Sequence, residues 1–177
     1  MSNIIILWSM IIIPVLTLFF MKKEDIKRFA PVALLTAVTG AIIVESGTTL
    51  HLWEVKETLF PLNQIPPYIY AAIPIFTMWI FKFTYGRLWL YVLTNAIIDI
   101  GFAYVILPWL VRIGIFAFIS SSLQIYLINI VHEFVLYGYQ MWQDDIFAHS
   151  EKTSLSTMLQ PAASKPVHEI DNNPDKE

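Results

Sequence analysis

Residues 88–110, "LWLYVLTNAIIDIGFAYVILPWL", are an apolar run with two strongly polar side chains, Asn95 and Asp99. A helix of this length rises about 34 Å, which is enough to cross the roughly 30 Å hydrocarbon core of a bilayer. In lipid the backbone has to satisfy its own hydrogen bonds, which a helix does. The run also lacks the alternating polarity of a membrane β-strand. It therefore predicts a transmembrane helix.

The rest of the chain contains four more runs of this kind. Apolar residues make up 56% of the 177 residues and charged residues only 14%, far below the quarter that soluble domains contain. We therefore expect an all-α integral membrane bundle of five transmembrane helices in the bacterial plasma membrane, occupying residues 1–147. The expected spans cover residues 3–21, 29–50, 67–85, 88–110 and 115–141.

The positive charges predict the orientation of the bundle. The segment 22–28, "KKEDIKR", follows the first span, and Lys82 and Arg87 lie between the third and fourth spans. Cytoplasmic loops are enriched in Lys and Arg, so these segments are expected inside and the N-terminus outside. Five spans then place the C-terminus inside. In this arrangement only two of the eleven Lys and Arg residues, Lys56 and Arg112, lie outside.

Two segments lie outside the predicted spans. Residues 51–66 form the longest connection, and we expect them to lie partly on the outer membrane surface, with Trp53 as an interface anchor. Trp142, just after the fifth span, is expected to anchor the inner surface. From residue 148 the sequence becomes polar and contains three prolines, which predicts a disordered cytoplasmic tail over 148–177.

Polar groups inside the spans are the candidates for function. A charge at membrane depth costs about 2.5–3.5 kcal/mol on insertion scales, so such groups face the bundle interior or a water-filled cavity. Asn95 and Asp99 are spaced by four residues and so lie on one face of their helix, and the same holds for Asn129 and Glu133. The candidates for a transport path or polar site are Glu45, Asn95, Asp99, Asn129, His132 and Glu133.

Each candidate also has a structural interpretation. Glu45 is close enough to the outer boundary to reach lipid headgroups. Asn95 and Asp99 can form an interhelical hydrogen bond that fixes packing. His132 and Glu133 lie about two turns from the inner surface, where Glu133 can reach the interface or pair with Arg87.

Several site types are excluded or unsupported by the sequence. The chain has no cysteine, which excludes disulfides, thiol catalysis, iron–sulfur clusters and Cys-ligated zinc. The stretch "HEFVL" resembles the zinc-protease helix, but the second histidine of that motif is replaced by Leu136. No phosphate-binding loop, nucleophile motif or basic nucleic-acid patch is present. We therefore predict no metal site, no cofactor, no catalytic residue and no nucleic-acid partner.

The segment "ESGTTLHLWE", the following "PP" and "IPIFTMWIFKF", and the ending "ILPWL" resemble a family of small, uncharacterised membrane proteins of Gram-positive spore-forming bacteria. The matching positions are Glu45, Gly47, Trp53, Pro66 and Pro74. The resemblance covers roughly residues 1–147 and implies a multi-spanning membrane protein without an established activity. The family has Asp at the position of Glu45, so the resemblance does not assign Glu45 the same role.

Three functions are compatible with this sequence. The first is an accessory or scaffold subunit of the cell envelope, with a membrane-protein partner or a second copy of the chain. The second is a small transport protein for ions, protons or solutes, in which Glu45, Asp99 and Glu133 line a path from outside to inside. The third is an intramembrane enzyme that acts on a lipid or isoprenoid through its carboxyl groups. We rank the accessory or scaffold role first, the transport role second and the enzyme third.

Overall fold

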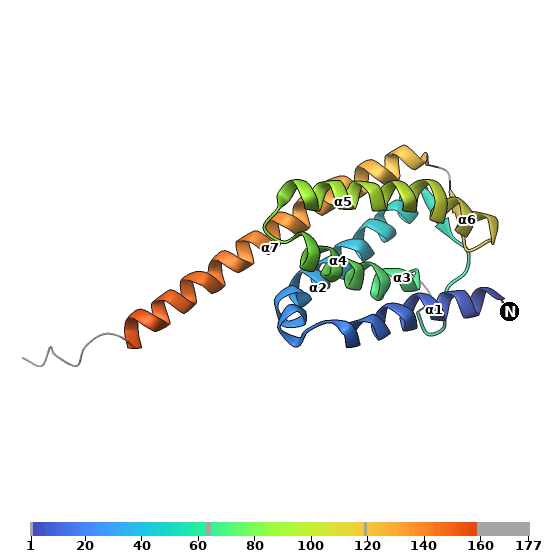
Figure 1. Ribbon diagram of the computed structural model, residues 1–177. Helices are drawn as coiled ribbons and strands as arrows, with labels where there is room; N and C mark the ends of the chain where they lie inside the picture. The colour runs from blue at the N-terminus through green and yellow to red at the C-terminus, as the bar shows by residue number, and fades with distance from the viewer. Residues whose placement is uncertain (1, 63–64, 119, 159–177) are drawn as a thin grey trace, which may run out of the picture. The chain divides into compact units, whose positions relative to one another are not determined.

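A computed structural model describes residues 2–62, 65–118 and 120–158 of the chain. It divides into two compact units, Met1–Met141 and Trp142–Glu177. The first unit is mostly helical (Figure 1). Its helices and the strands that interrupt them are α1 (Ser2–Thr17), a 3-10 turn (Leu18–Phe20), α2 (Lys23–Thr49), β1 (Trp53–Val55), α3 (Pro67–Tyr70), α4 (Ala72–Thr84), α5 (Leu88–Gly101), a π-helical turn (Phe102–Ile106), α6 (Leu107–Arg112), β2 (Phe116–Phe118) and the start of α7 (Ser122–Met158).

Three helical segments among the described residues are long and apolar enough to cross a membrane: Asn3–Phe20, Lys23–Thr49 and Leu88–Arg112. Their length and composition indicate a membrane location. Helix α4 is apolar but has only 13 residues, so it rises about 20 Å. The chain is thus mostly helical, as expected for the all-α class. The five spans and their orientation stay predictions.

The interior of the first unit contains an aromatic cluster and two smaller apolar clusters. Helix α4 packs against α2, and α1 packs against α3 and α4. The ring of Phe81 lies 4.8 Å from Tyr91 and 5.9 Å from Phe29, centroid to centroid, which joins α4 to α5 and α2. Such ring pairs stabilise a core beyond the area they bury.

The third expected span, 67–85, is broken into α3 and α4 at Ala71. Proline at position 74 explains the break, because it has no N–H to donate to the carbonyl of Tyr70 and its ring crowds that carbonyl. The fourth span is continuous, but it widens into the π-helical turn ahead of Pro108. Pro108 cannot donate to the carbonyl of Tyr104, which lies within that turn. Both irregularities thus follow from proline positions.

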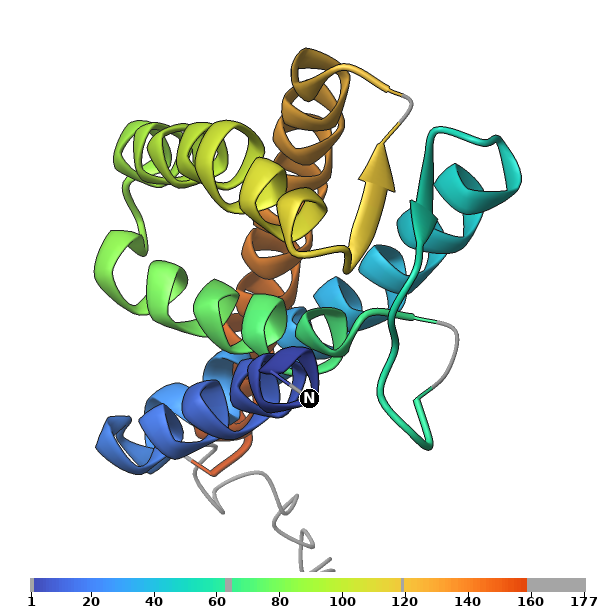
Figure 2. The same cartoon turned by 90° about the vertical axis from the view of Figure 1, so that its right-hand side faces the viewer.

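The fifth expected span does not begin as a helix. Residues Phe116–Phe118 form β2, which pairs antiparallel with β1 so that Trp53 is opposite Phe118 and Val55 opposite Phe116 (Figure 2). Aromatic residues favour strands, and Gly114, at φ +81°, ends the preceding helix. The connection 51–66, expected on the membrane surface, therefore contributes a strand to a two-stranded sheet.

Helix α7 begins with a reciprocal cap. The backbone N–H of Gln124 donates to Ser121 Oγ at 3.3 Å, and the N–H of Ser121 donates to Gln124 Oε1 at 3.1 Å. This is the capping-box arrangement, which satisfies two backbone N–H groups that the helix itself cannot. The cap sets the start of the helix that carries Asn129, His132 and Glu133.

The second unit contains the end of α7, which continues to Met158. Residues 148–158, expected to be disordered, are therefore helical. No glycine or proline occurs between Gly138 and Pro161, so no residue of this stretch stops the helix. Residues 159–177 of the expected tail lie outside the described residues.

Candidate functional site

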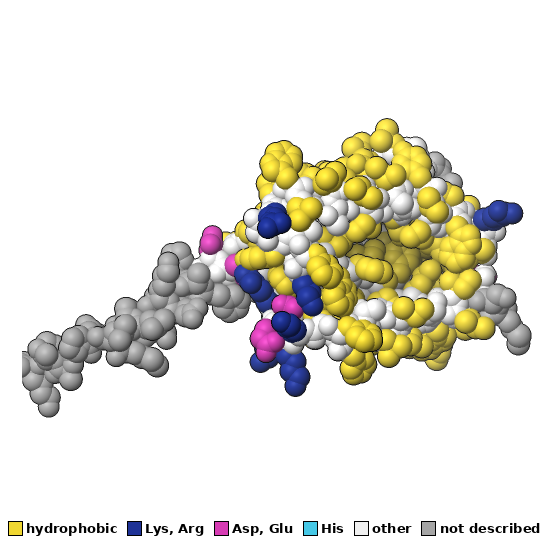
Figure 3. All heavy atoms as spheres, in the orientation of Figure 1, with side chains coloured by type: hydrophobic (Ala, Val, Ile, Leu, Met, Phe, Trp, Pro, Cys, Tyr) yellow, Lys and Arg dark blue, Asp and Glu magenta, His cyan; other side chains and the backbone are white. Residues whose placement is uncertain are grey.

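The first unit encloses a cavity of about 480 Å³. Its walls come from α1, α2, β1, α3, α4, α5, the π-helical turn, α6, β2 and α7, and most of the lining side chains are apolar. Figure 3 shows this face of the molecule hollowed, with apolar side chains around and within the hollow. A cavity of this size and composition is in the range of ligand pockets, which hold 300–1,000 Å³ and a few polar groups.

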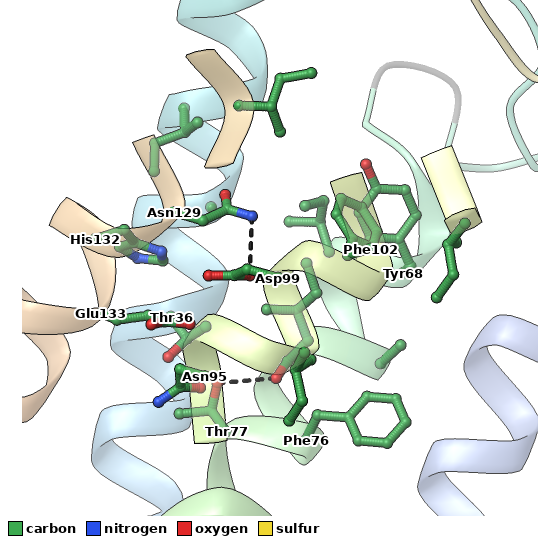
Figure 4. A pocket seen from close by; sticks show the side chains of 18 of the residues that line it. Thr36, Tyr68, Phe76, Thr77, Asn95, Asp99, Phe102, Asn129, His132 and Glu133 are labelled. Atoms are coloured by element: carbon green, nitrogen blue, oxygen red, sulfur yellow. Dashed lines mark hydrogen bonds between the residues drawn. The ribbon is translucent and has the colours of Figure 1, made fainter. Parts of the chain in front are cut away.

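One wall of the cavity gathers the polar side chains that the sequence singled out. Asn95 and Asp99 come from α5, and Asn129, His132 and Glu133 come from α7 (Figure 4). The spacing of four residues places Asn95 with Asp99 and Asn129 with Glu133 on one face of each helix, as predicted, and both faces line the cavity. We call these five residues the polar cluster.

Asp99 is the central member of the polar cluster. Its side chain is only 7% exposed. Asn129 Nδ2 donates to Asp99 Oδ1 at 3.1 Å, which links α5 to α7. The second oxygen, Oδ2, is buried and has no hydrogen-bond partner among the described residues. The carboxyls of Asp99 and Glu133 are close enough to interact, so two acids meet at this point.

His132 is held by α2 through a short hydrogen bond. Thr39 Oγ1 lies 2.6 Å from His132 Nε2 and also donates to the carbonyl of Leu35 at 2.7 Å. A hydroxyl has one proton, and the carbonyl of Leu35 can only accept. We therefore infer that the proton between the two side chains is on Nε2 and that His132 donates to Thr39.

Other polar groups of the cavity wall bond to backbone carbonyls. Asn95 Nδ2 donates to the carbonyl of Tyr91 at 3.1 Å, and the Tyr91 hydroxyl donates to the carbonyl of Glu133 at 3.2 Å. The hydroxyls of Thr36 and Thr77 donate to Val32 and Ile73 of their own helices at 2.8 and 3.0 Å. Each of these four side chains thus already donates one hydrogen bond.

Away from the polar cluster the cavity is lined by aromatic and aliphatic side chains. The ring of Tyr68 lies 6.0 Å from the rings of both Phe102 and Phe116, centroid to centroid. Three apolar lining residues are also exposed on the surface, and we call them the rim: Phe76 at 59%, Ile98 at 48% and Ile106 at 46%. The rim places an apolar opening of the cavity on the outer surface of the helices.

The remaining sequence candidates lie elsewhere. Glu45 is exposed on α2 and does not line the cavity. Trp53, expected at the membrane interface, is only 7% exposed and lines the cavity. Its indole Nε1 donates to the carbonyl of Val44 at 3.2 Å. Trp142 belongs to the second unit and is exposed; its role as an anchor stays a prediction.

The expected pairing of Glu133 with Arg87 is not found among the residues that the structure describes, and Lys82, the other nearby cation, pairs elsewhere. Lys82 Nζ lies 3.3 Å from Asp25 Oδ2. In the described part of the chain no salt bridge joins Glu133 to Lys82 or Arg87. Neither Lys nor Arg is found among the residues that line the cavity.

The sequence did not single out the residues of α2 that complete the site. Thr36 and Gly40 line the cavity, and Thr39 holds His132. Their signal was a run of small residues spaced by three or four in an apolar helix, which is typical of close helix packing in membranes. Within the described residues, no group of three His, Asp or Glu side chains is placed to hold a metal ion.

Comparison of the chain with models of protein families, with curated proteins and with solved structures finds no match. The resemblance to small membrane proteins of spore-forming bacteria stays a prediction. The geometry of the cavity is the basis for the function that follows.

Proposed function

We propose that this protein binds one lipid- or isoprenoid-like molecule in the cavity of its helix bundle. The observation that carries the proposal is the cavity itself, about 480 Å³ of mostly apolar space with the polar cluster on one wall. Apolar walls with few convergent polar groups are typical of small-molecule sites. The apolar rim supports loading from the membrane, because a molecule dissolved in lipid meets an apolar opening.

The volume gives the size of the ligand. An apolar protein cavity of about 150 Å³ holds one benzene, so about 480 Å³ accommodates roughly 15 to 20 carbon atoms. This corresponds to an isoprenoid of three or four units or to a fatty chain of similar length. A phospholipid with two long chains is larger than this space.

We further propose the membrane arrangement expected from the charges, with five spans, the N-terminus outside and the C-terminus inside. Two contacts support it, because Lys82–Asp25 and Arg28–Tyr85 bring the cationic segments 22–28 and 82–87 to one end of the unit. Pairing of β1 with β2 brings the connections that contain Lys56 and Arg112 together. The end that contains segments 22–28 and 82–87 carries more Lys and Arg, which favours the cytoplasmic side for that end.

A second candidate function is favoured by the acid pair. Asp99 and Glu133 lie beside a cavity lined by aromatic rings, and a carboxyl pair can donate and accept a proton in turn. A lipid- or isoprenoid-modifying enzyme would use the same cavity. The ion path is less well supported, because Glu45, its expected outer member, is exposed and outside the cavity. The scaffold role stays a prediction.

The binding proposal is tested with farnesol, a 15-carbon isoprenoid alcohol. The full chain is purified in mild detergent, incubated with farnesol and analysed by native mass spectrometry. We expect a one-to-one adduct for the wild type. Gly40→Leu should lose the adduct, because Gly40 lines the cavity and only Ile69 lies near its missing Cβ, at 3.5 Å.

Gly138→Leu is the matched control. Gly138, like Gly40, is helical, but it is exposed, has no atom within 4 Å of its missing Cβ and does not line the cavity. This variant should keep the adduct. Ala72→Leu, which fills the cavity from the α4 side, provides a second test if Gly40→Leu does not fold. An equal adduct in the wild type and in both filled variants would overturn the proposal.

A further inference from the structure

The polar cluster distinguishes between head groups of the ligand, and this inference rests on the binding function proposed above. We propose that the bound molecule has a head group that donates hydrogen bonds, a hydroxyl or an amine, and carries no phosphate or carboxylate. The molecule is thus an amphiphilic alcohol or amine with a chain of roughly 15 to 20 carbons, the size estimated from the cavity.

The polar groups of the cavity wall include an acceptor that lacks a donor among the described residues. Four polar side chains of the cavity wall each already donate one hydrogen bond: Asn129 to Asp99, Asn95 to the Tyr91 carbonyl, and Thr36 and Thr77 to carbonyls of their own helices. An acceptor has been left over, because Asp99 Oδ2 is buried without a partner. A buried acceptor without a donor is destabilising, so a ligand that supplies the donor is favoured.

The charge of the cavity wall disfavours an anionic head group. Two carboxyls, Asp99 and Glu133, meet there, and no Lys or Arg is among the lining residues. Phosphate sites in proteins rely on cations or on free backbone N–H groups. A phosphate or carboxylate placed beside this acid pair would be repelled without a compensating charge. An alcohol or an ammonium group would instead meet acceptors.

Asp99, which carries the unpartnered oxygen, lies across the pocket from the aromatic rings (Figure 4). Figure 4 shows that Asp99 extends from α5 toward α7, between Asn129 and Glu133, and that Tyr68, Phe76 and Phe102 lie on the other side of the pocket. A ligand whose chain lies along these rings therefore brings its head group to the polar cluster. The hydrocarbon chain and the head group are recognised by different walls of one cavity.

The experiment uses tritiated farnesol bound to the full chain in nanodiscs, with three competitors that share its 15-carbon chain. Farnesylamine should displace the label as well as unlabelled farnesol does, and farnesyl phosphate should compete at least tenfold less well. Farnesal, whose aldehyde only accepts hydrogen bonds, should also compete about tenfold less well, because it cannot serve Asp99 Oδ2.

Asp99→Asn tests the residue that carries the inference. The amide keeps an oxygen for Asn129 but presents N–H groups where the wild type has Oδ2. Binding of farnesol should fall about tenfold, and the preference for farnesol over farnesal should decrease or reverse. Glu45→Gln removes an exposed acid outside the cavity and should change neither value. Thermal unfolding of both variants checks that they are folded.

The possible results separate this inference from the binding function. If no farnesyl compound binds, the proposed function itself fails. If all four compounds bind equally, or if farnesyl phosphate binds best, the cavity binds isoprenoids but the head-group inference is wrong. Discrimination that is unchanged in Asp99→Asn would also overturn the assignment to the polar cluster.

Discussion

The indole ring of Trp53 lies against the backbone of Gly47, in the space that a Cβ atom on Gly47 would occupy. The same indole donates to the carbonyl of Val44, one turn earlier in α2. Trp53 thereby fastens β1 to the end of α2 and forms part of the cavity wall. The glycine is required by this close approach, since any side chain there would displace the ring.

Gly47→Ala is therefore expected to destabilise the protein by about 1–3 kcal/mol, the usual cost of forcing an extra methyl group into a packed site. Gly138→Ala is the matched control, because nothing lies within 4 Å of its missing Cβ. In α7 that change should be neutral or stabilising, since alanine favours helix over glycine. Unfolding of both variants in mixed micelles measures the difference. Equal stability of the two would contradict the contact.

The bond between His132 and Thr39 predicts the tautomer of the imidazole. With the Thr39 hydroxyl donating to Leu35, the Nε2 of His132 should carry a proton. Nitrogen NMR of histidine-labelled protein, assigned with His132→Gln, should show a protonated Nε2 whose signal moves in Thr39→Val. Thr48→Val, which removes a hydroxyl bonded only to its own helix, should leave the signal in place. An unprotonated Nε2 in the wild type would refute the inference.

The ion pair between Lys82 and Asp25 should contribute little. Both side chains are partly exposed, and such pairs are worth about 0.2–1 kcal/mol. Lys82 also lies 4.7 Å from the centre of the Trp79 ring. Lys82→Gln should therefore cost more than Asp25→Asn, because it removes both interactions. A double-mutant cycle of unfolding free energies separates them, with exposed Lys23→Gln as the control. A coupling above about 2 kcal/mol would show that the pair is shielded from water.

The membrane arrangement can be tested without removing any native cysteine, because the chain has none. Glu24→Cys, in the first turn of α2, and Glu57→Cys, in the connection 51–66, replace exposed acids and keep every Lys and Arg. In intact cells a membrane-impermeant maleimide should label the cysteine at position 57 and spare that at position 24 until the cells are opened. The reverse labelling would place the N-terminus inside.

Helices were predictable from the sequence because long apolar runs have few alternatives in lipid. The interruptions were less visible. Pro74 and Pro108 both occur in apolar runs, yet one breaks a helix at Ala71 and the other is preceded by a π-helical turn. The pairing of 53–55 with 116–118 joins segments about sixty residues apart, and no local pattern identifies such a partner.

The candidate site was partly predictable for a similar reason. Polar side chains are costly in lipid, so Asn95, Asp99, Asn129, His132 and Glu133 stood out, and all five line one cavity. Glu45 stood out equally, but it lies on an exposed face. Its direction was not predictable, because hydropathy does not indicate which way a side chain points. Thr39 was not singled out, since its place in a run of small residues indicates close helix packing and does not identify His132 as its partner.

The π-helical turn before Pro108 has a consequence for the phase of its helix. Buried residues follow one another at intervals of four: Tyr91, Asn95, Asp99, Ala103 and Leu107. In a regular α-helix each such step overshoots a full turn by about 40°, so four steps would rotate Leu107 by about 160° from Tyr91. A turn with i→i+5 bonds holds more residues and takes up part of this rotation. With such a turn, residues spaced by four can thus stay on the inward-facing side of a membrane helix. In a regular α-helix the same spacing would rotate the last of them toward the lipid.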